Sequence, residues 1–295
     1  MGKEETAAMR DDFRKTKKGK TGSTAIIVLL VLLIGGLLVW RYNATRQLKL
    51  PYLTASSIVV TDCGNGRKLY QKNEEYPQSP ASLTKLMTLL LIMEDLEAGR
   101  LTWDDTFTVM PEQAYTPGSK YGMNPGEVFS VRQLVAGVIL ASGCDCVQCL
   151  VQMSAGNESD FVDRMNQKAQ ELGLKGSRFA NATGIDTNGH YMTAKDISLL
   201  SKLLIDTYPE VLDMSSQKEL TIEDRVFSNI NQLVVDDERV IGLKTGTSTM
   251  GGYSLVTVAE RDGRRSLIVL MNSNNKVSRY KETETILNAI YGENF

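Results

Sequence analysis

Ser82 and Lys85 are the residues of this 295-residue chain whose types and spacing best suit nucleophilic catalysis. They stand at the head of an apolar run, Leu83 to Leu96, where Pro80 favours a first helical turn and Ser79 can cap it. On such a helix Ser82 and Lys85 share one face. A serine hydroxyl attacks well only when a base takes its proton, and a lysine amine can be that base once burial lowers its pKa. Because the run is apolar on nearly all sides, the sequence predicts a serine nucleophile with a buried lysine base.

The Ser-x-x-Lys spacing is a weak signal by itself. It also occurs at 215–218, 273–276 and 278–281, but only the pair at Ser82 opens an apolar helix. The competing interpretation is a helix-entry serine with a solvated lysine one turn later. Other motifs in the sequence are therefore needed to distinguish a catalytic pair from a helix-entry serine with a solvated lysine.

A second candidate site is Lys244-Thr245-Gly246-Thr247, on or just after a predicted strand. The lysine and the two hydroxyls can hold a carboxylate, and the glycine makes the segment flexible. The backbone N–H of Thr247 can face a developing oxyanion. The same Lys-Thr-Gly letters at 20–22 have no strand around them, so we discard them. The alternative for the second site is an ordinary exit from a strand into a turn.

The composition is that of a globular protein and excludes several classes of function. Apolar residues make up 42% and charged residues 23%, and the net charge of −2 gives no indication of nucleic-acid binding. The single histidine, His190, excludes a histidine cluster for zinc and favours lysine as the base for a serine. Cys144, Cys146 and Cys149 lack a second, distant pair of ligands, so we expect buried thiols, no metal and no cofactor.

The N-terminal part of the chain predicts a single membrane anchor. Residues 1–22 are polar and end in lysines, which suits a cytoplasmic tail. The anchor is predicted at 23–42, where the apolar run Ala25 to Trp40 is about 25 Å long as a helix. A cleaved signal peptide is the alternative, but no small-residue cleavage site follows. Residues 43–54 then form a stalk, and 55–295 form one domain outside the cytoplasm.

The hydrophobic patterns after the stalk change from strands to helices and back to strands. The predicted elements are strands at 57–63 and 67–71, helices at 83–96, 131–140, 145–154, 159–172 and 193–207, strands at 225–235, 240–247, 253–260 and 265–271, and a helix at 280–291, with an irregular stretch at 100–130 and a loop at 177–190. This order predicts one α+β domain. Its antiparallel sheet joins N- and C-terminal strands, and a helical subdomain is inserted between them.

Together the motifs resemble those of the serine D-alanyl-D-alanine carboxypeptidases, the low-molecular-mass penicillin-binding proteins of the peptidase S11-like family. The resemblance runs from about residue 55 to 291. It includes ASLTKLMT at 81–88, NPGE at 124–127, the block at 181–200 and, most specifically, GLKTGTS with the residues that follow it to 264. It implies a penicillin-binding transpeptidase or class A β-lactamase-like fold.

The resemblance also implies a role for each matching residue. Ser82 would be the acylated nucleophile, Lys85 its general base, and Ser142 the relay of a proton to the leaving amine. The substrate carboxylate would be held by Lys244, Thr245, Gly246 and Thr247. The implied substrates are peptidoglycan stem peptides ending in D-Ala-D-Ala, with β-lactam antibiotics as acylating inhibitors. We therefore expect a bacterial cell-membrane enzyme of cell-wall synthesis and cell shape, anchored by one N-terminal helix.

One position departs from the family pattern. The Ser-x-Asn motif reads Ser142-Gly143-Cys144, and a thiol is a weaker hydrogen-bonding group than an amide. We expect Cys144 to contact substrate, either weakening activity or serving by another route. A weakly active or silent wall-peptide-binding homologue is therefore an alternative function. A β-lactamase is a further alternative, although the loop at 173–190 has no glutamate to activate a deacylating water.

Overall fold

The computed structural model describes residues 26–36 and 47–292, which belong to two units, 1–47 and 48–295. In the first unit the described residues form an exposed apolar helix at 26–36. Within the described ranges no helix combines the length and apolarity that a membrane crossing requires. The predicted tail at 1–22, the ends of the predicted anchor at 23–42 and residues 43–46 of the predicted stalk at 43–54 lie outside the described residues.

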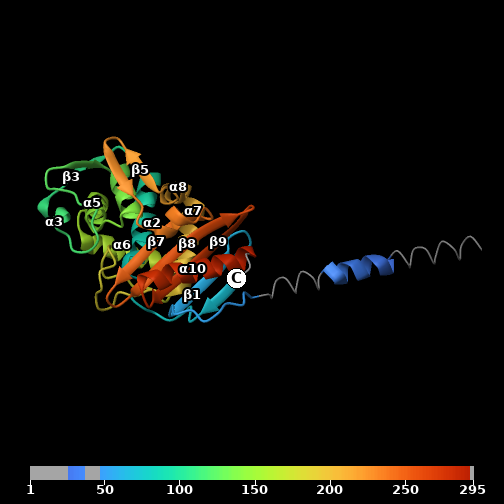
Figure 1. The fold of residues 1–295 in the computed structure, drawn as a ribbon. Coiled ribbons are helices and arrows are strands. Elements are labelled where there is room, and N and C mark those ends of the chain that lie inside the picture. Colours follow the sequence, from blue (N-terminus) through green and yellow to red (C-terminus); the bar gives the residue numbers. More distant parts are fainter. Residues whose placement is uncertain (1–25, 37–46, 293–295) are drawn as a thin grey trace, which may run out of the picture. The chain divides into compact units, whose positions relative to one another are not determined.

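The second unit is built on a five-stranded antiparallel sheet with the strand order β2-β1-β9-β8-β7 (Figure 1). The strands are β1 (Ser57–Asp62), β2 (Lys68–Lys72), β7 (Val240–Ser248), β8 (Gly252–Arg261) and β9 (Arg264–Ser273). The N-terminal hairpin thus pairs through β1 with β9, a strand more than 200 residues later in the chain. The predicted sheet of N- and C-terminal strands is confirmed.

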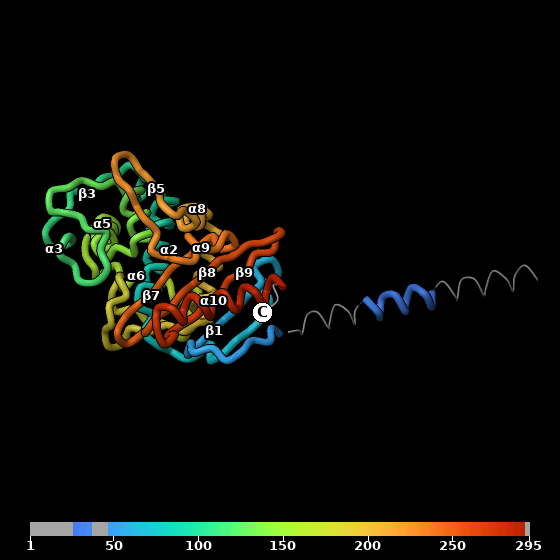
Figure 2. Tube along the Cα trace, viewed as in Figure 1, coloured from blue at the N-terminus to red at the C-terminus, as the bar shows by residue number. Residues whose placement is uncertain are grey.

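Both faces of the sheet are covered because alternate residues of its strands are apolar on each side. On β9, Val269 packs into one core and Leu270 into the other. The first core contains α2 (Lys85–Glu97) and α7 (Ala194–Thr207). The second contains the closing helix α10 (Lys276–Tyr291), which runs along β8 and β9 (Figures 1 and 2).

The segment between the hairpin and β7 is mainly helical, which confirms the predicted inserted subdomain. After the short 3-10 helix η1 (Ala81–Thr84) and α2 come α3 (Pro111–Ala114), α4 (Val131–Leu140), α5 (Cys144–Ala155), α6 (Glu158–Glu171), α7, α8 (Pro209–Ser215) and α9 (Gln232–Asp236). Two small antiparallel pairs accompany them: β3 (Thr106–Thr108) with β4 (Val128–Ser130), and β5 (Glu219–Ile222) with β6 (Arg225–Ser228).

Several local predictions are wrong. The strand predicted at 225–235 is β6 followed by α9, because Asn231 caps a helix at the position where the apolar run continues. The stretch predicted as irregular at 100–130 contains β3, α3 and β4. Ser79 does not cap the helix of Ser82, since its hydroxyl donates instead to Asp186 Oδ1 at 2.6 Å.

Candidate active site

Ser82 lies in η1, and Lys85 is the first residue of α2. The Lys85 Nζ atom is 2.8 Å from Ser82 Oγ. Because α2 is buried on nearly all sides, the lysine side chain is carried into the core and has 0% exposure. The two residues lie three apart on a tight helical turn, where i and i+3 side chains meet. The local prediction of a serine beside a buried lysine therefore describes the geometry correctly.

Burial lowers the pKa of Lys85, although the nearby Cys144 opposes the shift. The ammonium is also 2.7 Å from the carbonyl oxygen of Thr183 and 3.4 Å from Cys144 Sγ. These contacts aim Nζ at Ser82 and leave it little freedom to turn away. An amine with a lowered pKa, held in hydrogen-bond reach of a hydroxyl, can take the proton of that hydroxyl.

Ser142 and Lys244 form a second serine–lysine pair. Ser142 follows α4 with φ 57°, a left-handed conformation that is uncommon outside glycine. Its Oγ atom is 2.7 Å from Lys244 Nζ, and its carbonyl accepts from Ser119 Oγ at 2.7 Å. Lys244 is 2% exposed, and its pKa is well below the usual range because of burial and then because of the charge of Lys85.

The segment 244–247 lies on β7, the edge strand of the main sheet, where it faces the 3-10 helix of Ser82. Gly246 is needed for this close approach. A Cβ atom there would lie 3.1 Å from the carbonyl oxygen of Pro80 and 3.2 Å from Leu83 Cγ. Its absence lets the strand and the nucleophile helix come together.

These elements enclose a groove of about 450 Å³. Its lining includes the predicted residues Ser82, Ser142, Cys144, Thr245 and Thr247. Lys85 and Lys244 lie buried beneath it, each bonded to a lining serine. The structure therefore brings together all the residues for which the sequence predicts a role.

Arg279 is a residue at this site that the sequence reasoning missed. It is 3% exposed, and its guanidinium donates to the carbonyl of Gly246 at 3.1 Å and to Thr247 Oγ1 at 3.2 Å. It thus places a positive charge directly behind the segment predicted to bind a carboxylate. The closing helix was predicted to begin at 280, whereas α10 begins at Lys276, and this error at the boundary hid the residue.

The loop at 181–190 lines the other side of the groove through residues that include Asp186. Asp186 accepts from Ser79 and from the backbone N–H of Met250 at 2.9 Å, which ties the loop to the turn after β7. Burial alone would raise the pKa of Asp186, but these hydrogen bonds outweigh it and lower the pKa. The sequence block at 181–200 was noticed, yet nothing in it marked Asp186 as this link.

His190 is buried and hydrogen-bonded on both ring nitrogens. Its Nδ1 accepts the backbone N–H of Ala180 at 3.0 Å, so Nε2 carries the proton and donates to Thr84 Oγ1 at 2.7 Å. Burial lowers its pKa to about 4, and the charge of Asp186 offsets only part of this shift. The neutral ring therefore braces the residue that precedes Lys85.

Cys144 occupies the position of the family's asparagine and is 2% exposed. Its Sγ atom is 3.4 Å from Lys85 Nζ and 3.9 Å from Ser119 Oγ. A Cβ atom on Gly118 would lie only 2.8 Å from Sγ, so the backbone of the opposite segment packs directly on the thiol. The thiol therefore contacts the base and lines the groove at the same time.

Known proteins are similar to this chain in sequence and in fold. A family profile for D-alanyl-D-alanine carboxypeptidases (peptidase S11) matches residues 44–275. The chain is 30% identical to D-alanyl-D-alanine carboxypeptidase DacF of Bacillus subtilis over 92% of its own length and 70% of that protein. It is 32% identical to DacC of Escherichia coli, over 83% of this chain and 63% of the relative.

Solved structures of similar proteins agree with these matches. Penicillin-binding protein D2 of Listeria monocytogenes, solved in its cefotaxime-bound form, is 31% identical with a TM-score of 0.76 and covers 82% of this chain and 99% of its own. The carboxypeptidase DacD of Francisella tularensis is 27% identical with a TM-score of 0.78, over 83% of this chain and 72% of that one. The predicted penicillin-binding, transpeptidase-type α+β fold is thereby confirmed.

Proposed function

Because this chain belongs to the D-alanyl-D-alanine carboxypeptidase family, we propose that it removes the terminal D-alanine from peptidoglycan stem peptides through an acyl-enzyme on Ser82. The observation that carries the proposal is the buried Lys85 amine, 2.8 Å from the Ser82 hydroxyl and lowered in pKa by its burial. This pairing supplies the base that an unassisted serine lacks.

Acylation begins when the neutral amine of Lys85 takes the proton of Ser82 Oγ. The alkoxide attacks the carbonyl carbon of the penultimate D-alanine, and the backbone N–H groups of Ser82 and Thr247 receive the developing oxyanion. Ser142, 2.7 Å from Lys244, passes a proton to the departing amine, and the proton that Lys85 took from Ser82 restores the Ser142 hydroxyl and leaves Lys85 neutral again. The C–N bond breaks, D-alanine leaves, and the acyl group stays on Ser82 as an ester.

The leaving D-alanine carries a carboxylate, and Lys244 with Thr245 and Thr247 supports its recognition. Lys244 is buried beside Ser142, and Arg279 adds positive charge behind the strand. An arriving carboxylate favours the protonated form of Lys244. Deacylation then uses water, which gives a proton to Lys85 as it attacks the ester carbonyl. Lys85 passes this proton to Ser82 Oγ as the ester bond breaks, which regenerates the hydroxyl and the neutral amine.

β-Lactam antibiotics are the proposed inhibitors, since the same serine would open their strained amide. Support comes from the Listeria relative, which has been solved in cefotaxime-bound and ampicillin-bound forms. We further propose that residues 23–42 anchor the enzyme in the cell membrane with its domain outside the cytoplasm. The support for this part is the apolar run 25–40 and the lysines before it.

A silent wall-peptide-binding homologue is the second candidate function, and Cys144 is the observation that favours it. The position that matches the family's asparagine carries a thiol, which cannot offer the same donor to a substrate carbonyl. Such a protein would keep the groove and bind stem peptides without efficient turnover.

The purified full-length chain tests these possibilities when it is treated with a fluorescent penicillin and assayed for D-alanine release. Labelling that disappears in Ser82→Ala, together with release, is the expected result. Labelling without release would favour the silent homologue. Rapid destruction of the penicillin would favour a β-lactamase, and absence of labelling with absence of release would contradict both the carboxypeptidase and the β-lactamase.

A further inference from the structure

Lys85 and Cys144 hold an amine and a thiol against each other at the wall of the groove. The Lys85 Nζ atom is 3.4 Å from Cys144 Sγ, and both side chains are buried. Reacting atoms held roughly 3–3.5 Å apart are close enough for a bond to form between them. All four cysteines of the chain belong to the described residues, and Cys144 is the one that lines the groove. The family's asparagine has no sulfur to oxidise, so the chemistry of this contact depends on the departure at residue 144.

Three neighbours surround the Lys85 amine and fix its direction. The carbonyl oxygen of Thr183, 2.7 Å from Nζ, can only accept a hydrogen bond, so it takes one N–H of the amine. The other N–H and the lone pair of the neutral amine are left for Ser82 Oγ, at 2.8 Å, and for Cys144 Sγ. The amine that serves Ser82 as a base can therefore also direct its lone pair at the sulfur.

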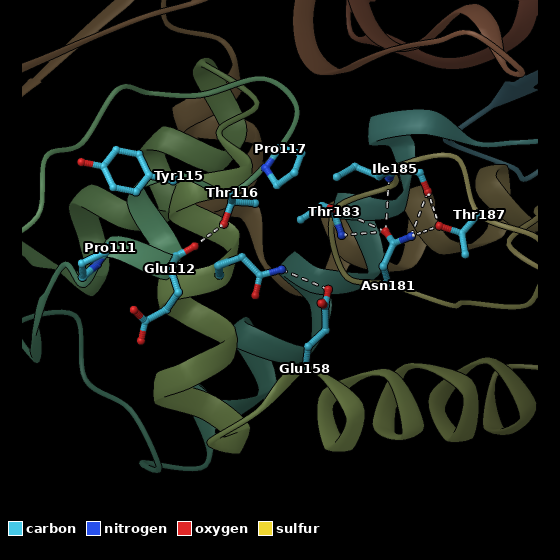
Figure 3. A pocket seen from close by; sticks show the side chains of 11 residues that line it. Pro111, Glu112, Tyr115, Thr116, Pro117, Glu158, Asn181, Thr183, Ile185 and Thr187 are labelled. Carbon is cyan, nitrogen blue, oxygen red and sulfur yellow. Dashed lines mark hydrogen bonds between the residues drawn. The ribbon is translucent and has the colours of Figure 1, made fainter.

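The carbonyl of Thr183 is itself held in place by its loop. Figure 3 shows Asn181 bonded to Thr183 and to Thr187. The Asn181 Oδ1 atom accepts from the backbone N–H and from the hydroxyl of Thr183, each at 3.2 Å, and Nδ2 donates to Thr187 Oγ1 at 3.1 Å. Because this network fixes Thr183, the loop keeps the Lys85 amine next to the Cys144 thiol.

Small solutes can reach the sulfur through the groove. Its volume of about 450 Å³ is many times the roughly 30 Å³ that one water molecule occupies in the liquid. The groove adjoins a second cavity of about 620 Å³, with which it shares Pro117, Thr183 and Ile185 (Figure 3). Hydrogen peroxide is only slightly larger than water, so it fits in the groove beside Cys144 Sγ.

We propose that hydrogen peroxide joins Cys144 and Lys85 through a reversible sulfur–nitrogen bond, a sulfenamide, and that this cross-link inactivates the enzyme. The effect on activity rests on the proposed carboxypeptidase function, whereas the cross-link itself does not. In the first step Lys85 takes the thiol proton, and the sulfur attacks one oxygen of the peroxide. The O–O bond breaks, and the departing hydroxide takes the proton from Lys85 and leaves as water. Cys144 is then a sulfenic acid, and Lys85 is a neutral amine again.

The second step joins the two side chains. The lone pair of Lys85 Nζ attacks the sulfur of the sulfenic acid, the S–O bond breaks, and the departing hydroxide takes a proton from the nitrogen. One thiol, one amine and one peroxide thus give one sulfenamide and two waters, with the sulfur oxidised and the peroxide reduced. The flexible lysine stem closes the distance to the sulfur.

The cross-link removes the base of Ser82 and can be reversed. A nitrogen bonded to Cys144 Sγ is drawn away from Ser82 and no longer takes the proton of its hydroxyl. A dithiol reductant breaks the S–N bond: its two thiols become a disulfide, and their hydrogens restore the thiol of Cys144 and the amine of Lys85.

Peroxide treatment of the full-length protein, followed by a fluorescent penicillin, tests the effect on activity. The rate of acylation should fall by about 10² to 10⁴, the contribution of a general base, and should return after a dithiol reductant is added. Cys144→Ser, which has no sulfur at this position, should acylate at the same rate before and after peroxide.

Cys63→Ala is the matched control, because it removes a half-buried thiol that lies outside the groove lining. Peroxide should lower its rate of acylation as it does in the unaltered protein. A loss that persists in Cys144→Ser, a loss that the reductant does not reverse, or an unchanged rate in the unaltered protein would overturn the proposal.

Peptide mapping by mass spectrometry gives a readout that needs no activity. The treated protein should contain two peptides joined through Cys144 and Lys85, lighter by two hydrogens than the separate peptides. Oxidation of exposed methionines such as Met250 adds oxygen but joins no peptides. Absence of the cross-link, or a bond from Cys144 to another cysteine, would refute the inference. If the untreated protein neither binds penicillin nor releases D-alanine, the proposed function fails, and the peptide map still decides the inference.

Discussion

The pairs Ser82–Lys85 and Ser142–Lys244 have nearly the same geometry but different origins. Their hydroxyl–amine distances are 2.8 and 2.7 Å, and both lysines are buried. The first pair is made within one helical turn, whereas the second joins residues 102 positions apart, from the end of α4 and the edge strand β7.

The surroundings of the two lysines explain how one groove can use them differently. Lys85 faces a carbonyl oxygen and a sulfur, acceptors that hold the amine in place but leave it next to a hydroxyl it can deprotonate. Lys244 lies near Arg279 and near Lys85, and the charges of Arg279 and of protonated Lys85 lower the pKa of Lys244 further after burial. Positive charge concentrated on this side favours an anion. The same residue type therefore suits a base in one place and an anion site in the other.

The largest effect should come from replacing the base. Lys85→Ala should lower the rate of acylation by about 10² to 10⁴, the usual contribution of a general base. Lys85→Arg should not restore it, because a guanidinium keeps its proton. Acylation is followed with a fluorescent penicillin in single-turnover mode. Substantial recovery with arginine would mean that Lys85 contributes charge and not proton transfer, and the difference between the two pairs would disappear.

Protonation of His190, which is hydrogen-bonded to Thr84 just before Lys85, should lower the free energy of unfolding substantially. Its pKa is about 4 in the folded chain and about 6.5 when unfolded, so between these values the unfolded chain binds more protons. Stability should therefore fall as pH drops from about 6.5 to about 4, by on the order of 3 kcal/mol. Urea unfolding at several pH values measures this change.

The control for that prediction is His190→Gln. Because His190 is the single histidine of the chain, the variant should flatten the pH dependence between 4 and 6.5 apart from the part due to carboxylates such as Asp186. Curves that stay parallel for the two proteins would contradict a buried neutral imidazole. In that case the protonation state of His190 would not contribute to holding the segment that carries Ser82 and Lys85.

Replacing Lys244 in the proposed carboxylate site should lower activity less than replacing Lys85, and arginine should recover part of the activity at this position. Lys244→Ala should cost about 1.5–3 kcal/mol, the worth of a hydrogen bond to a charged group, or roughly ten- to hundredfold in kcat/KM for a D-Ala-D-Ala peptide. Lys244→Arg should recover part of the loss because the charge remains. Kinetics of D-alanine release measure both variants. A complete loss that arginine does not recover would give Lys244 the same kind of role as Lys85 and remove the contrast.

The two pairs also show which parts of the site the sequence could predict: the pair within one helical turn, but not the contact between distant segments. Ser82 and Lys85 were found from their spacing, because a helical turn fixes their separation. The sheet was predicted because β1, β8 and β9 have strand-like patterns and the predicted strands lie before and after the helices in the chain. The contact of Ser142 with Lys244 depends on where β7 meets the inserted helices, which periodicity does not encode, so only the family resemblance indicated it. Arg279 was missed because the closing helix was predicted to begin at 280 and not at Lys276. The link through Asp186 was missed because it joins segments that are distant in the sequence.

The smallest expected effect concerns Cys144, the residue that touches both the base and the groove. An asparagine there would keep an acceptor for Lys85 and add an amide donor for a substrate carbonyl, worth about 0.5–1.5 kcal/mol, or roughly two- to tenfold in acylation rate. Cys144→Asn should therefore acylate faster with a fluorescent penicillin, while Cys149→Ala, which removes a buried thiol outside the groove lining, should not change that rate. An unchanged or slower rate in Cys144→Asn would mean that the close packing of Gly118 on the sulfur has fitted this groove to a thiol. In that case the role of Cys144 would be to accept a hydrogen bond from Lys85 and hold it beside Ser82, and not to bind substrate.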